Sequence, residues 1–530
     1  MKKFFIFALL ILVTCDLCPV TCRAQLVLNS ESVEQVRKVQ MAQLAISSLY
    51  VDSVDQKKLA EDAIRGMLDK LDPHSTYSNA EETKKLTEPL NGNFEGIGVQ
   101  FNLLDDTLVV IQPTSKGPSE KAGILAGDRI VSVDGDPIAG VKMSRDSIMH
   151  RLRGPKGTKV RLGVVRRGVN DPIFFNVVRD KIPLNTIDAS YIVAPGIGYI
   201  RIESFGATTG KELHEAIAKL KKQGMRDLIL DLEQNGGGYL GAASEVAGEF
   251  LERGKLVVYT EGRAADRQTL SVEGEGSFLD GRLVVMVDEY TASAAEIVSG
   301  AVQDHDRGTI VGRRTFGKGL VQRPIPLPDG SLIRLTTAHY YTPSGRCIQK
   351  PYEKGAKDDY AADIAQRLQR GELTCIDSIR LDSTQTFYTL ERHRAVYGGG
   401  GIMPDVFVPL DTTTYTKYYQ ALRRNNLFNE HVLKYIDANR RTLQRQYKKS
   451  DDFIDRFEVP AALTDTIIAA AKAKKIEPAD DAELQASLPD MRFTLKSLIL
   501  YDLWDRNDYF RFVNRRSDVL KAALRELGAE

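Results

Sequence analysis

Residues 283–303 read LVVMVDEYTASAAEIVSGAVQ and join two different apolar patterns at one serine. The unbroken apolar run 283–287 predicts a buried strand, because strands of parallel sheets are covered on both faces. After it, apolar residues recur at the spacing of one helix face: Ala294, Ile297, Val298, Ala301 and Val302. The sequence therefore predicts a strand that turns directly into a helix, with Ser293 at the corner.

The same alternation of apolar strands and helical segments extends from Gly198 to Val311. Strands are expected at 199–202, 228–232, 256–259, 283–287 and 309–311, and helices at 211–223, 241–251 and 293–303. This order predicts an α/β layer with largely parallel strand pairing. A further β run at 332–341 ends in a Thr-Pro-Ser-Gly turn.

The segments on either side have other patterns. Apolar residues at helical spacing predict a helical region over 33–71, whereas short β-branched runs separated by Gly and Pro predict a small, mostly β domain between Gly92 and Asp180. Beyond about Pro409 the chain is helical, rich in charge and tyrosine, and without a cluster of chemistry-bearing residues. The chain is therefore expected to divide into an N-terminal segment 1–24, a helical region 25–91, a mostly β domain 92–180, an α/β domain 181–409 and a helical region 410–530.

Charge and cysteine content exclude several classes of protein. Lys and Arg number 72 against 71 for Asp and Glu, so there is no excess positive charge to hold nucleic acid. Three of the five cysteines lie within the first 24 residues, which leaves Cys347 and Cys375 for one disulfide at most. No HExxH pair and no zinc-ligand spacing occur. We expect no metal and no other cofactor.

The N-terminus has the pattern of a signal peptide. Lys2 and Lys3 precede a short apolar run, 4–13, which is shorter than the roughly 20 residues that span a bilayer. Cleavage is expected after Ala24, so that residues 1–24 form the signal peptide. The alternative is an imperfect lipobox before Cys15, which would anchor the chain to a membrane through lipid. Both alternatives predict an exported protein, periplasmic or associated with the cell envelope.

Ser293 has two interpretations. With Glu296 it forms an S-x-x-E capping box, and most such serines only satisfy the free N–H groups of a helix start. The same corner suits a nucleophile, because the helix N-terminus supplies N–H groups and the positive end of a dipole where an oxyanion would develop. This segment alone leaves both interpretations open.

A serine nucleophile needs a base. Lys318 stands between two glycines in TFGKGLVQ, residues 315–322, and glycine flanks let a lysine approach neighbouring backbone closely. Because lysine has an ordinary pKa of about 10.4, a base that works near neutrality needs a strongly lowered pKa, which burial away from water can impose. The alternative is a surface lysine in a glycine turn.

A second glycine cluster, Asn235-Gly236-Gly237-Gly238, follows the expected strand 228–232 at its carboxyl end. Open α/β sheets place their sites at this end, and glycines let backbone N–H groups point at a bound group. The cluster lacks the continuation of a phosphate-binding loop. An oxyanion hole and a plain flexible turn remain as alternatives.

These segments together resemble the carboxyl-terminal processing peptidases, also called tail-specific proteases, from about residue 35 to residue 407. The motifs that carry the resemblance follow in the order and spacing of that family. They are Gly66–Leu68 with Leu71–Ser75, Gly96–Val99, Leu152–Pro155 with Gly157–Thr158, Asp231–Leu232, Asn235, Gly237–Gly238, Thr291–Glu296, Gly317–Gly319 with Gln322, Tyr341–Arg346, and Gly401–Ile402 with Pro404–Asp405.

The resemblance implies an α/β core like that of the Clp protease and crotonase group, with an inserted, mostly β PDZ domain and helical N- and C-terminal regions. It also implies a serine endopeptidase with a Ser/Lys mechanism, in which Ser293 is the nucleophile and Lys318, 25 positions later, is the general base. The supporting roles that it implies are lysine positioning for Gln322, an acidic residue near the site for Glu296, and an oxyanion hole from Gly237 and Ala294.

One motif departs from the family. The usual Asp-Leu-Arg-x-Asn-Pro-Gly-Gly has Glu233 in place of the arginine and Gly236 in place of the proline. The reversed charge and the added flexibility bear on the rigidity of the loop that carries Gly237.

The 92–180 segment resembles a PDZ domain, and the family likeness implies a loop whose N–H groups hold the terminal carboxylate of a substrate. The residues of this loop are Gly96, Ile97, Gly98 and Val99. Strand addition would hold the rest of the tail. The expected partners are protein substrates with apolar carboxyl termini and an adaptor protein, and oligomers are compatible with the sequence. Arg153, in the same segment, is a candidate regulatory residue.

Three alternatives have to be weighed. A tail-binding scaffold without hydrolysis would not need Ser293, Lys318 and Gln322, which are all present. A crotonase-type acyl-thioester enzyme could share the core topology and a glycine oxyanion hole, but needs neither a PDZ-like insertion nor Lys318. His305 as the base is excluded by distance, because it lies twelve residues, or about 18 Å, along the same expected helix as Ser293.

Overall fold

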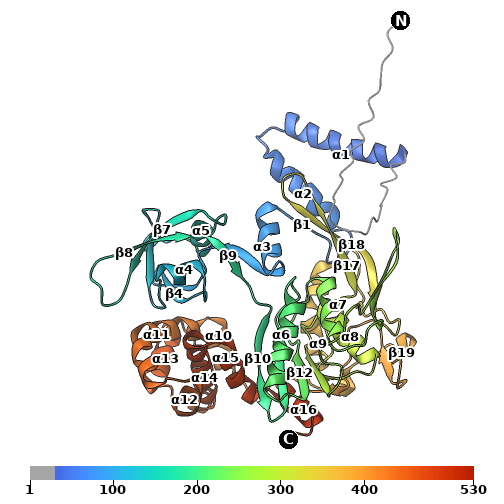
Figure 1. Cartoon of the computed structure of the whole chain (residues 1–530). Coiled ribbons are helices and arrows are strands. Elements are labelled where there is room, and N and C mark those ends of the chain that lie inside the picture. Colours follow the sequence, from blue (N-terminus) through green and yellow to red (C-terminus); the bar gives the residue numbers. More distant parts are fainter. Residues whose placement is uncertain (1–29, 530) are drawn as a thin grey trace.

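The computed structural model describes residues 30–529 and shows an α/β body with two smaller modules beside it (Figure 1). The β-rich module with β4, β7 and β8 lies above the helical module with α11 to α14 in this view. The α/β body holds the central sheet, and the N-terminal helices project from it. Residues 1–24, the predicted signal peptide, lie outside the described residues.

The central sheet has six strands in the order β10-β11-β12-β15-β16-β21. All neighbours are parallel except the pair β10/β11. The bounds are β10 Ile187–Ala194, β11 Ile197–Ile202, β12 Asp227–Asp231, β15 Leu283–Val287, β16 Thr309–Gly312 and β21 Val406–Phe407. The predicted α/β layer with largely parallel pairing is confirmed.

Successive residues of the central strands face two different cores, since side chains alternate across a strand. In β15, Leu283, Val285 and Val287 belong to one core, whereas Val284 and Met286 belong to the other. The first core is covered by α6 Thr209–Lys222, α7 Leu240–Gly248 and α8 Ala294–Asp304. The second is covered by α16 Asp518–Glu526. The last helix of the chain therefore completes the body that holds the central sheet.

A second sheet, largely antiparallel, corrects one expectation. Residues 256–259 were expected within the parallel layer, but β13 pairs antiparallel with β14 and β18. The reason is that β13 enters a hairpin, so its backbone groups are taken by the next strand. The bounds are β1 Thr76–Ser78, β13 Leu256–Gly262, β14 Ala265–Ser271, β17 Leu320–Pro326 and β18 Leu332–Tyr341.

The β-rich module is built on the sheet β3-β4-β5-β7-β8, with β6 paired to β5, and has its own core. Strand β3 pairs only with β4, so its other edge is open among the described residues. The bounds are β2 Asn93–Gly96, β3 Val99–Leu104, β4 Thr107–Pro113, α4 Pro118–Ala122, β5 Arg129–Val133, β6 Asp136–Pro137, α5 Arg145–Leu152, β7 Lys159–Val165, β8 Ile173–Val178 and β9 Asp180–Pro183.

Helices make up both ends of the described chain, as predicted. The N-terminal ones are α1 Ser30–Leu49, α2 Gln56–Leu68 and α3 Ala80–Leu90. The C-terminal module has a separate core and contains α10 Lys417–Arg424, α11 Leu427–Gln446, α12 Ser450–Arg456, α13 Ala461–Ala473, α14 Asp481–Leu503 and α15 Arg506–Val513. The α/β body also contains α9 Lys357–Gln369 and the short strands β19 Thr386–Tyr388 and β20 Ala395–Tyr397.

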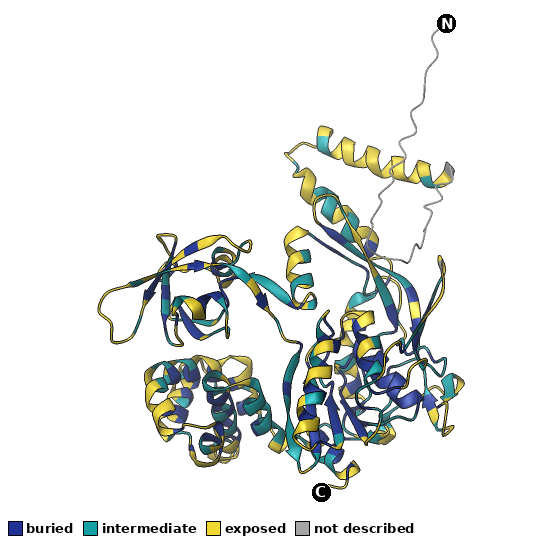
Figure 2. Ribbon diagram, viewed as in Figure 1, coloured by how far each residue is buried: buried dark blue, intermediate teal, exposed yellow. Residues whose placement is uncertain are grey.

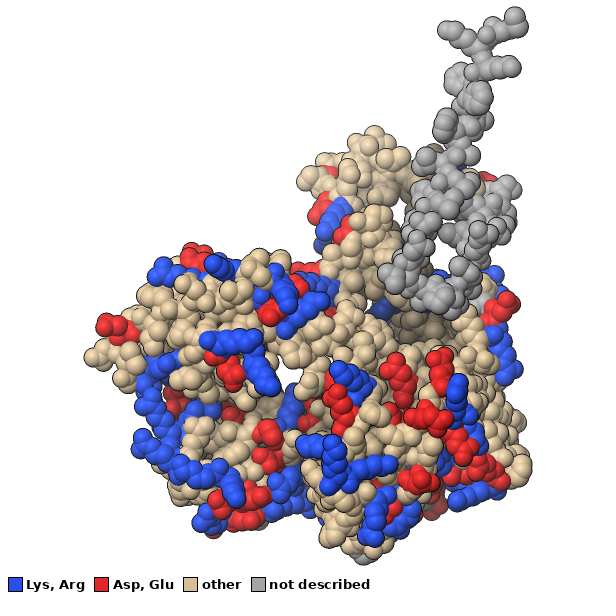
Figure 3. Space-filling model, viewed as in Figure 1, with Lys and Arg blue, Asp and Glu red and all other residues tan. Residues whose placement is uncertain are grey.

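Helix α1 is exposed along most of its length (Figure 2). Its exposed side chains include Val36, Met41 and Leu44, and the top of the molecule is largely uncharged in Figure 3. Elsewhere on the face seen in Figure 3, Lys and Arg are interspersed with Asp and Glu. Among residues 30–529, no helix is long and apolar enough to cross a membrane.

Candidate active site

Three neighbouring strands of the central sheet, β12, β15 and β16, end at one edge. Because parallel strands have their carboxyl ends on the same side, the loops that follow them meet there. The loop after β12 carries Gly237, the turn after β15 carries Ser293, and the segment after β16 carries Lys318. The sheet thus gathers three predicted site residues from distant parts of the sequence.

Ser293 has a backbone conformation that L-amino acids rarely adopt, with φ of 58° and ψ of −117°. A strained residue of this kind costs about 1–3 kcal/mol and persists only where its surroundings impose it. The strain arises where the connection 288–293 from β15 enters α8, whose first residue is Ala294. The predicted corner is confirmed, and its strain is of the kind that clusters at active sites.

Gly237 packs directly on this turn. A Cβ atom at its position would lie 2.8 Å from the carbonyl oxygen of Ala292, the nitrogen of Ala294 and Cβ of Ser293. Its φ of 93° also favours glycine. Only a residue without a side chain can therefore approach the Ser293 turn this closely.

Asn235 holds the glycine loop against its neighbours. Its Nδ2 donates to the Ile202 carbonyl at 2.7 Å, and its main-chain oxygen accepts from the N–H of Ala292 at 2.9 Å. Its Oδ1 accepts from the N–H of Gly237 at 2.8 Å. One of the two N–H groups expected in the oxyanion hole is therefore engaged by a side chain, whereas the N–H of Ala294 has no acceptor among residues 30–529.

The departures at Glu233 and Gly236 leave this loop well held. The N–H of Glu233 donates to Asp231 at 2.8 Å, and its carbonyl accepts from Arg201 at 2.8 Å. Burial, together with the carboxylates of Asp231 and Asp288, raises the pKa of Glu233 well above its usual value. The side chain that replaces the family's arginine is accordingly favoured in its neutral form.

Glu296 is fully buried and accepts four hydrogen bonds. Its Oε2 accepts from the N–H groups of Ser293 and Lys318, each at 2.8 Å. Its Oε1 accepts from the N–H of Gly317 at 2.7 Å and from Oγ1 of Thr315 at 2.5 Å. Because two of these N–H groups share one oxygen, the main-chain nitrogens of Ser293 and Lys318 lie within about 6 Å of each other.

Tyr340 joins the same two segments from the other side. Its hydroxyl contacts the carbonyl oxygen of Ser293 at 3.2 Å and also that of Lys318. Tyr340 is a fully buried residue of β18. In the sequence it looks like any other residue of an apolar β run, so no local motif indicated a role at the site. Only the pairing of β18 with β13 and β17 brings it under the Ser293 turn.

The environment of Lys318 favours its neutral form. Burial and, to a smaller extent, the charge of Arg334 lower the pKa of Lys318 to about 8, against the opposing carboxylates of Glu296 and Asp72. The side chain is half-buried, and its Nζ makes no hydrogen bond within residues 30–529. A lysine of this kind is available as a proton acceptor near neutral pH.

Family models match four consecutive parts of the chain. "Peptidase family S41" matches residues 196–362, "PDZ domain" matches 96–174, and "Activating protease CtpB N-terminal domain" matches 21–83. A family of unknown function matches 418–505, within the helical C-terminal module.

Curated proteins are similar over most of their length. The carboxy-terminal-processing protease of Bartonella bacilliformis is 39% identical over 309 residues, which are 57% of this chain and 70% of the relative. The chain belongs to the carboxyl-terminal processing peptidases. The carboxy-terminal processing protease CtpB of Bacillus subtilis is 32% identical over 369 residues, covering 69% of this peptidase and 74% of the relative.

Two solved structures are also similar to parts of this peptidase. The photosystem II D1 C-terminal processing protease is 28% identical, with 72% of this chain and 94% of that chain covered and a TM-score of 0.36. The PDZ domain of the carboxy-terminal protease from Vibrio cholerae, in complex with peptide, is 31% identical, with 17% and 99% covered and a TM-score of 0.16. The S41 and PDZ matches with the curated relatives make this protein a serine-type peptidase with a PDZ domain.

Gln322 reaches the site of this peptidase through a network. Its Nε2 donates to Oγ1 of Thr336 at 3.2 Å, and Thr336 donates to the buried Asp72 at 2.8 Å. Oγ of Ser75 donates to Asp72 at 2.5 Å. Burial raises the pKa of Asp72, but these hydrogen bonds outweigh it and lower the pKa overall. Gln322 is therefore linked through Thr336 to an ionised Asp72, whose charge raises the pKa of Lys318, and within residues 30–529 no hydrogen bond joins Gln322 to Lys318 itself.

The PDZ loop of this peptidase is positioned by its carbonyl groups. The carbonyl of Ile97 accepts from N–H and Oγ of Ser119, at 3.0 and 2.7 Å, and that of Gly98 accepts from Thr114 at 3.0 Å. Gly98 has φ of 70° and would place a Cβ 2.8 Å from Ile182. The N–H groups of Ile97 and Gly98 have no acceptor within residues 30–529, so they are available to an anion.

Other candidates fall away from the site. His305 ends α8 at the opposite end from Ser293, and its Nε2 lies 2.7 Å from the carbonyl of Leu256. Cys347 and Cys375 are free thiols. Residues 30–529 contain no cluster of His, Cys, Asp and Glu that could hold a metal ion.

Proposed function

We propose that this peptidase cleaves protein substrates by a Ser/Lys mechanism, with Ser293 as nucleophile and Lys318 as general base. The observation that carries the proposal is that one oxygen of the Glu296 carboxylate, Oε2, accepts hydrogen bonds from the main-chain N–H groups of both residues. Neutral Lys318 takes the proton of the Ser293 hydroxyl while Oγ attacks the peptide carbonyl carbon. The protonated lysine then gives that proton to the leaving amine, and water releases the acyl group by the same route.

The proposed oxyanion hole consists of the N–H groups of Ala294 and Gly237. The first has no acceptor within the described residues and lies at the start of α8, where the helix dipole stabilises negative charge. The second has to leave Oδ1 of Asn235 before it can donate to the oxyanion. Binding of substrate thereby includes a local rearrangement of the glycine loop.

We propose that the PDZ domain selects substrates by their apolar carboxyl termini, held at the N–H groups of Gly96, Ile97, Gly98 and Val99. The free N–H groups of Ile97 and Gly98 support this function, and the open edge of β3 can add the tail as a strand. An N–H group that donates to a carboxylate forms a charge-assisted hydrogen bond, which is stronger than a neutral one.

Amidation of a substrate tail is expected to weaken its capture about ten- to a hundredfold, because it removes the charge that the loop binds. The measurement is the KM for one reporter protein with a free or an amidated terminus. Gly98→Val should have the same effect on the free tail, since a side chain there collides with Ile182. Gly140→Val, at an open left-handed turn of the same domain, is the matched control. Equal KM values for both termini would contradict tail capture.

Arg153 connects the PDZ domain to the segment beside the glycine loop. Its guanidinium pairs with Glu88 of α3 and lies 4.8 Å from the ring of Phe94. Helix α3 is followed by Asn91, which accepts a hydrogen bond from the Tyr239 hydroxyl at 2.9 Å. Tyr239 directly follows Gly238. We propose on these contacts that Arg153 transmits occupancy of the PDZ domain to the active site.

Arg153→Ala is expected to lower kcat about tenfold at a saturating tail-tagged substrate and to leave tail affinity within about twofold, because the substituted side chain acts between the two sites. Steady-state kinetics separate the two parameters. Arg151→Ala, whose exposed pair with Asp136 stays within the PDZ domain, is the control. Loss of tail affinity with unchanged kcat would show that Arg153 only shapes the binding groove.

We propose that the chain is exported, on the charged and apolar pattern of its first 24 residues, and works in the periplasm or at the cell envelope. Mass analysis of the mature protein should then find Gln25 at its start. A lipid on Cys15 would show anchoring to a membrane instead, and an intact Met1 would contradict export.

The proposed division 25–91, 92–180, 181–409 and 410–530 is supported by separate cores in the PDZ domain and the C-terminal module, although α16 at the end of the last segment packs on the central sheet. The exposed apolar face of α1 supports contacts with an adaptor protein or a second copy. Neither the composition nor the face of the molecule seen in Figure 3 supports a nucleic-acid partner.

A further inference from the structure

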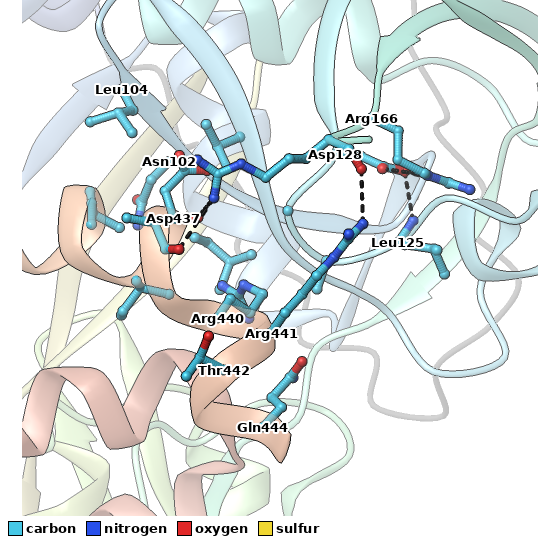
Figure 4. Close-up of a pocket in the computed structure, with 18 of the residues that line it drawn as sticks. Asn102, Leu104, Leu125, Asp128, Arg166, Asp437, Arg440, Arg441, Thr442 and Gln444 are labelled. Atoms are coloured by element: carbon cyan, nitrogen blue, oxygen red, sulfur yellow. Dashed lines mark hydrogen bonds and ion pairs between the residues drawn. The ribbon is translucent and has the colours of Figure 1, made fainter. Parts of the chain in front are cut away.

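The C-terminal module is docked on the PDZ domain by polar contacts. Arg129 pairs with Asp437 of α11 at 2.8 Å, and Arg167 donates to the carbonyl of Asp437 at 2.7 Å. Arg441 donates in return to the carbonyl of Arg167 at 2.8 Å. A cavity of about 560 Å³ lies between the two parts. Figure 4 shows residues that line it, with Asp437 and Arg441 on the helix opposite Asn102 and Asp128.

A second cavity, of about 370 Å³, coincides with the tail groove. Its PDZ walls are the loop of Ile97 to Val99, strand β3 as far as Asn102, and the face of α5 with Met149 and Leu152. The remaining wall comes from the C-terminal module and consists of Tyr501, Asp502 and Arg506. The groove that the proposed function assigns to the substrate tail is therefore shared by two parts of the chain.

The cations of this groove already have partners. Arg506 pairs with Asp188 and, at 3.0 Å, with Glu203. Arg153 pairs with Glu88, and Arg145 stacks on Phe101 with its guanidinium carbon 4.8 Å from the ring centre. A tail that enters the groove meets Arg506 and Arg153 already paired with carboxylates, whereas Arg145 is held on the ring of Phe101.

Asp502 supplies the carboxylate among the lining residues of the groove, and this carboxylate has no such partner. Within residues 30–529 its carboxylate accepts no hydrogen bond and forms no ion pair. The nearby Arg440 donates to the main-chain carbonyl of Asp502 instead, at 3.4 Å. Burial raises the pKa of Asp502 to about 6, against the charge of Arg440. A carboxylate withdrawn from water in this way is stabilised by any cation that reaches it.

We infer that the C-terminal module completes the tail-binding groove, and that Asp502 selects substrate tails carrying a lysine or arginine upstream of an apolar carboxyl terminus. The tail would add to the edge of β3, so that alternate side chains face α5 and the module. The basic side chain then supplies the missing partner of Asp502. This inference rests on the proposed capture of tails and adds to it a second recognised position.

The test is a peptide-binding series on the full chain with Ser293→Ala, which prevents cleavage. Fluorescent twelve-residue peptides with an apolar terminus carry one lysine, moved through the second to eighth positions from the end, or alanine throughout. One position should bind about tenfold tighter than the all-alanine peptide. Asp502→Asn should remove that gain and leave binding of the all-alanine peptide within about twofold.

Charge reversal guards against a variant that is merely misfolded. In Asp502→Lys, glutamate at the same tail position should bind tighter than lysine. Asp481→Asn, about 30 Å away near the start of the same helix, is the matched control and should keep the lysine preference. A lysine preference that is absent, or unchanged in Asp502→Asn, overturns the inference. Equal binding of free and amidated peptides would instead overturn tail capture itself, so the two failures are distinguishable.

Discussion

Ser293→Ala and Lys318→Ala are each expected to reduce kcat/KM by at least about a thousandfold while the protein stays folded. The first removes the attacking oxygen and the second removes its proton acceptor, and neither residue fills a large core position. Residues that act as one unit are strongly non-additive, so the double variant should be no slower than either single variant. Cleavage of a tail-tagged reporter measures the loss, and a thermal melt checks the fold.

Two comparisons make this test specific. Ser299→Ala changes a buried serine of α8, the helix that begins directly after Ser293. Its hydroxyl donates to the main-chain carbonyl of Ala295, and the substitution should leave activity nearly unchanged. Lys350 is a second buried lysine, but its Nζ is paired with Asp363 at 2.9 Å, so it is not available as a base. Wild-type activity in Lys318→Ala, with loss in Lys350→Ala, would show that the base has been assigned to the wrong lysine.

The same dyad predicts a pH profile. Lys318 accepts a proton only when neutral, and burial lowers its pKa to about 8. Therefore kcat/KM should fall about tenfold per pH unit below pH 8 and level off above it. Arg334→Met removes a charge that lowers this pKa, so the rising limb should move to higher pH. A rising limb that stays at the same pH in Arg334→Met would show that it does not report the ionisation of Lys318.

Glu296→Gln is expected to reduce kcat by at least about a hundredfold and to destabilise the fold by about 2–4 kcal/mol. An amide has one oxygen, whereas the carboxylate accepts donors on both: the Ser293 and Lys318 N–H groups on Oε2, Gly317 and Thr315 on Oε1. One pair of buried donors would face an NH₂ group, and each unsatisfied donor costs about 1–3 kcal/mol. Kinetics and denaturant unfolding measure the two effects.

The control for Glu296 is a second capping-box glutamate. Glu82 caps α3 with Asn79 in the same arrangement but is exposed, so Glu82→Gln should cost less than about 1 kcal/mol and leave kcat unchanged. If the two variants behaved alike, Glu296 would be a helix cap and nothing more. A selective loss in Glu296→Gln would show that its carboxylate holds the two catalytic segments together.

Local patterns predicted most of the central sheet. The run 283–287 and the helical spacing after it locate β15 and α8 to within a residue. A strand buried on both faces has an unbroken apolar run, whereas a helix buried on one face has apolar residues at helical spacing. The run 256–259 was assigned to the wrong sheet because an apolar run shows that a strand is buried but does not show which strand it pairs with. Apolar character within a window is equal for a strand of the parallel layer and for β13, whose antiparallel partner β18 lies about eighty residues away.

For the candidate site, the sequence by itself determined which chemical groups are present. The corner serine, the glycine-flanked lysine and the glycine loop follow from short segments whose residue types serve few other purposes together. The tertiary structure alone decided how they are brought within reach. Strand pairing places Tyr340 beneath the Ser293 and Lys318 segments and links Asp72 to Gln322. The packing of the helical C-terminal module against the PDZ domain sets Asp502 into the PDZ groove. These contacts join residues tens to hundreds of positions apart, and hydrophobic periodicity describes only burial along neighbouring residues.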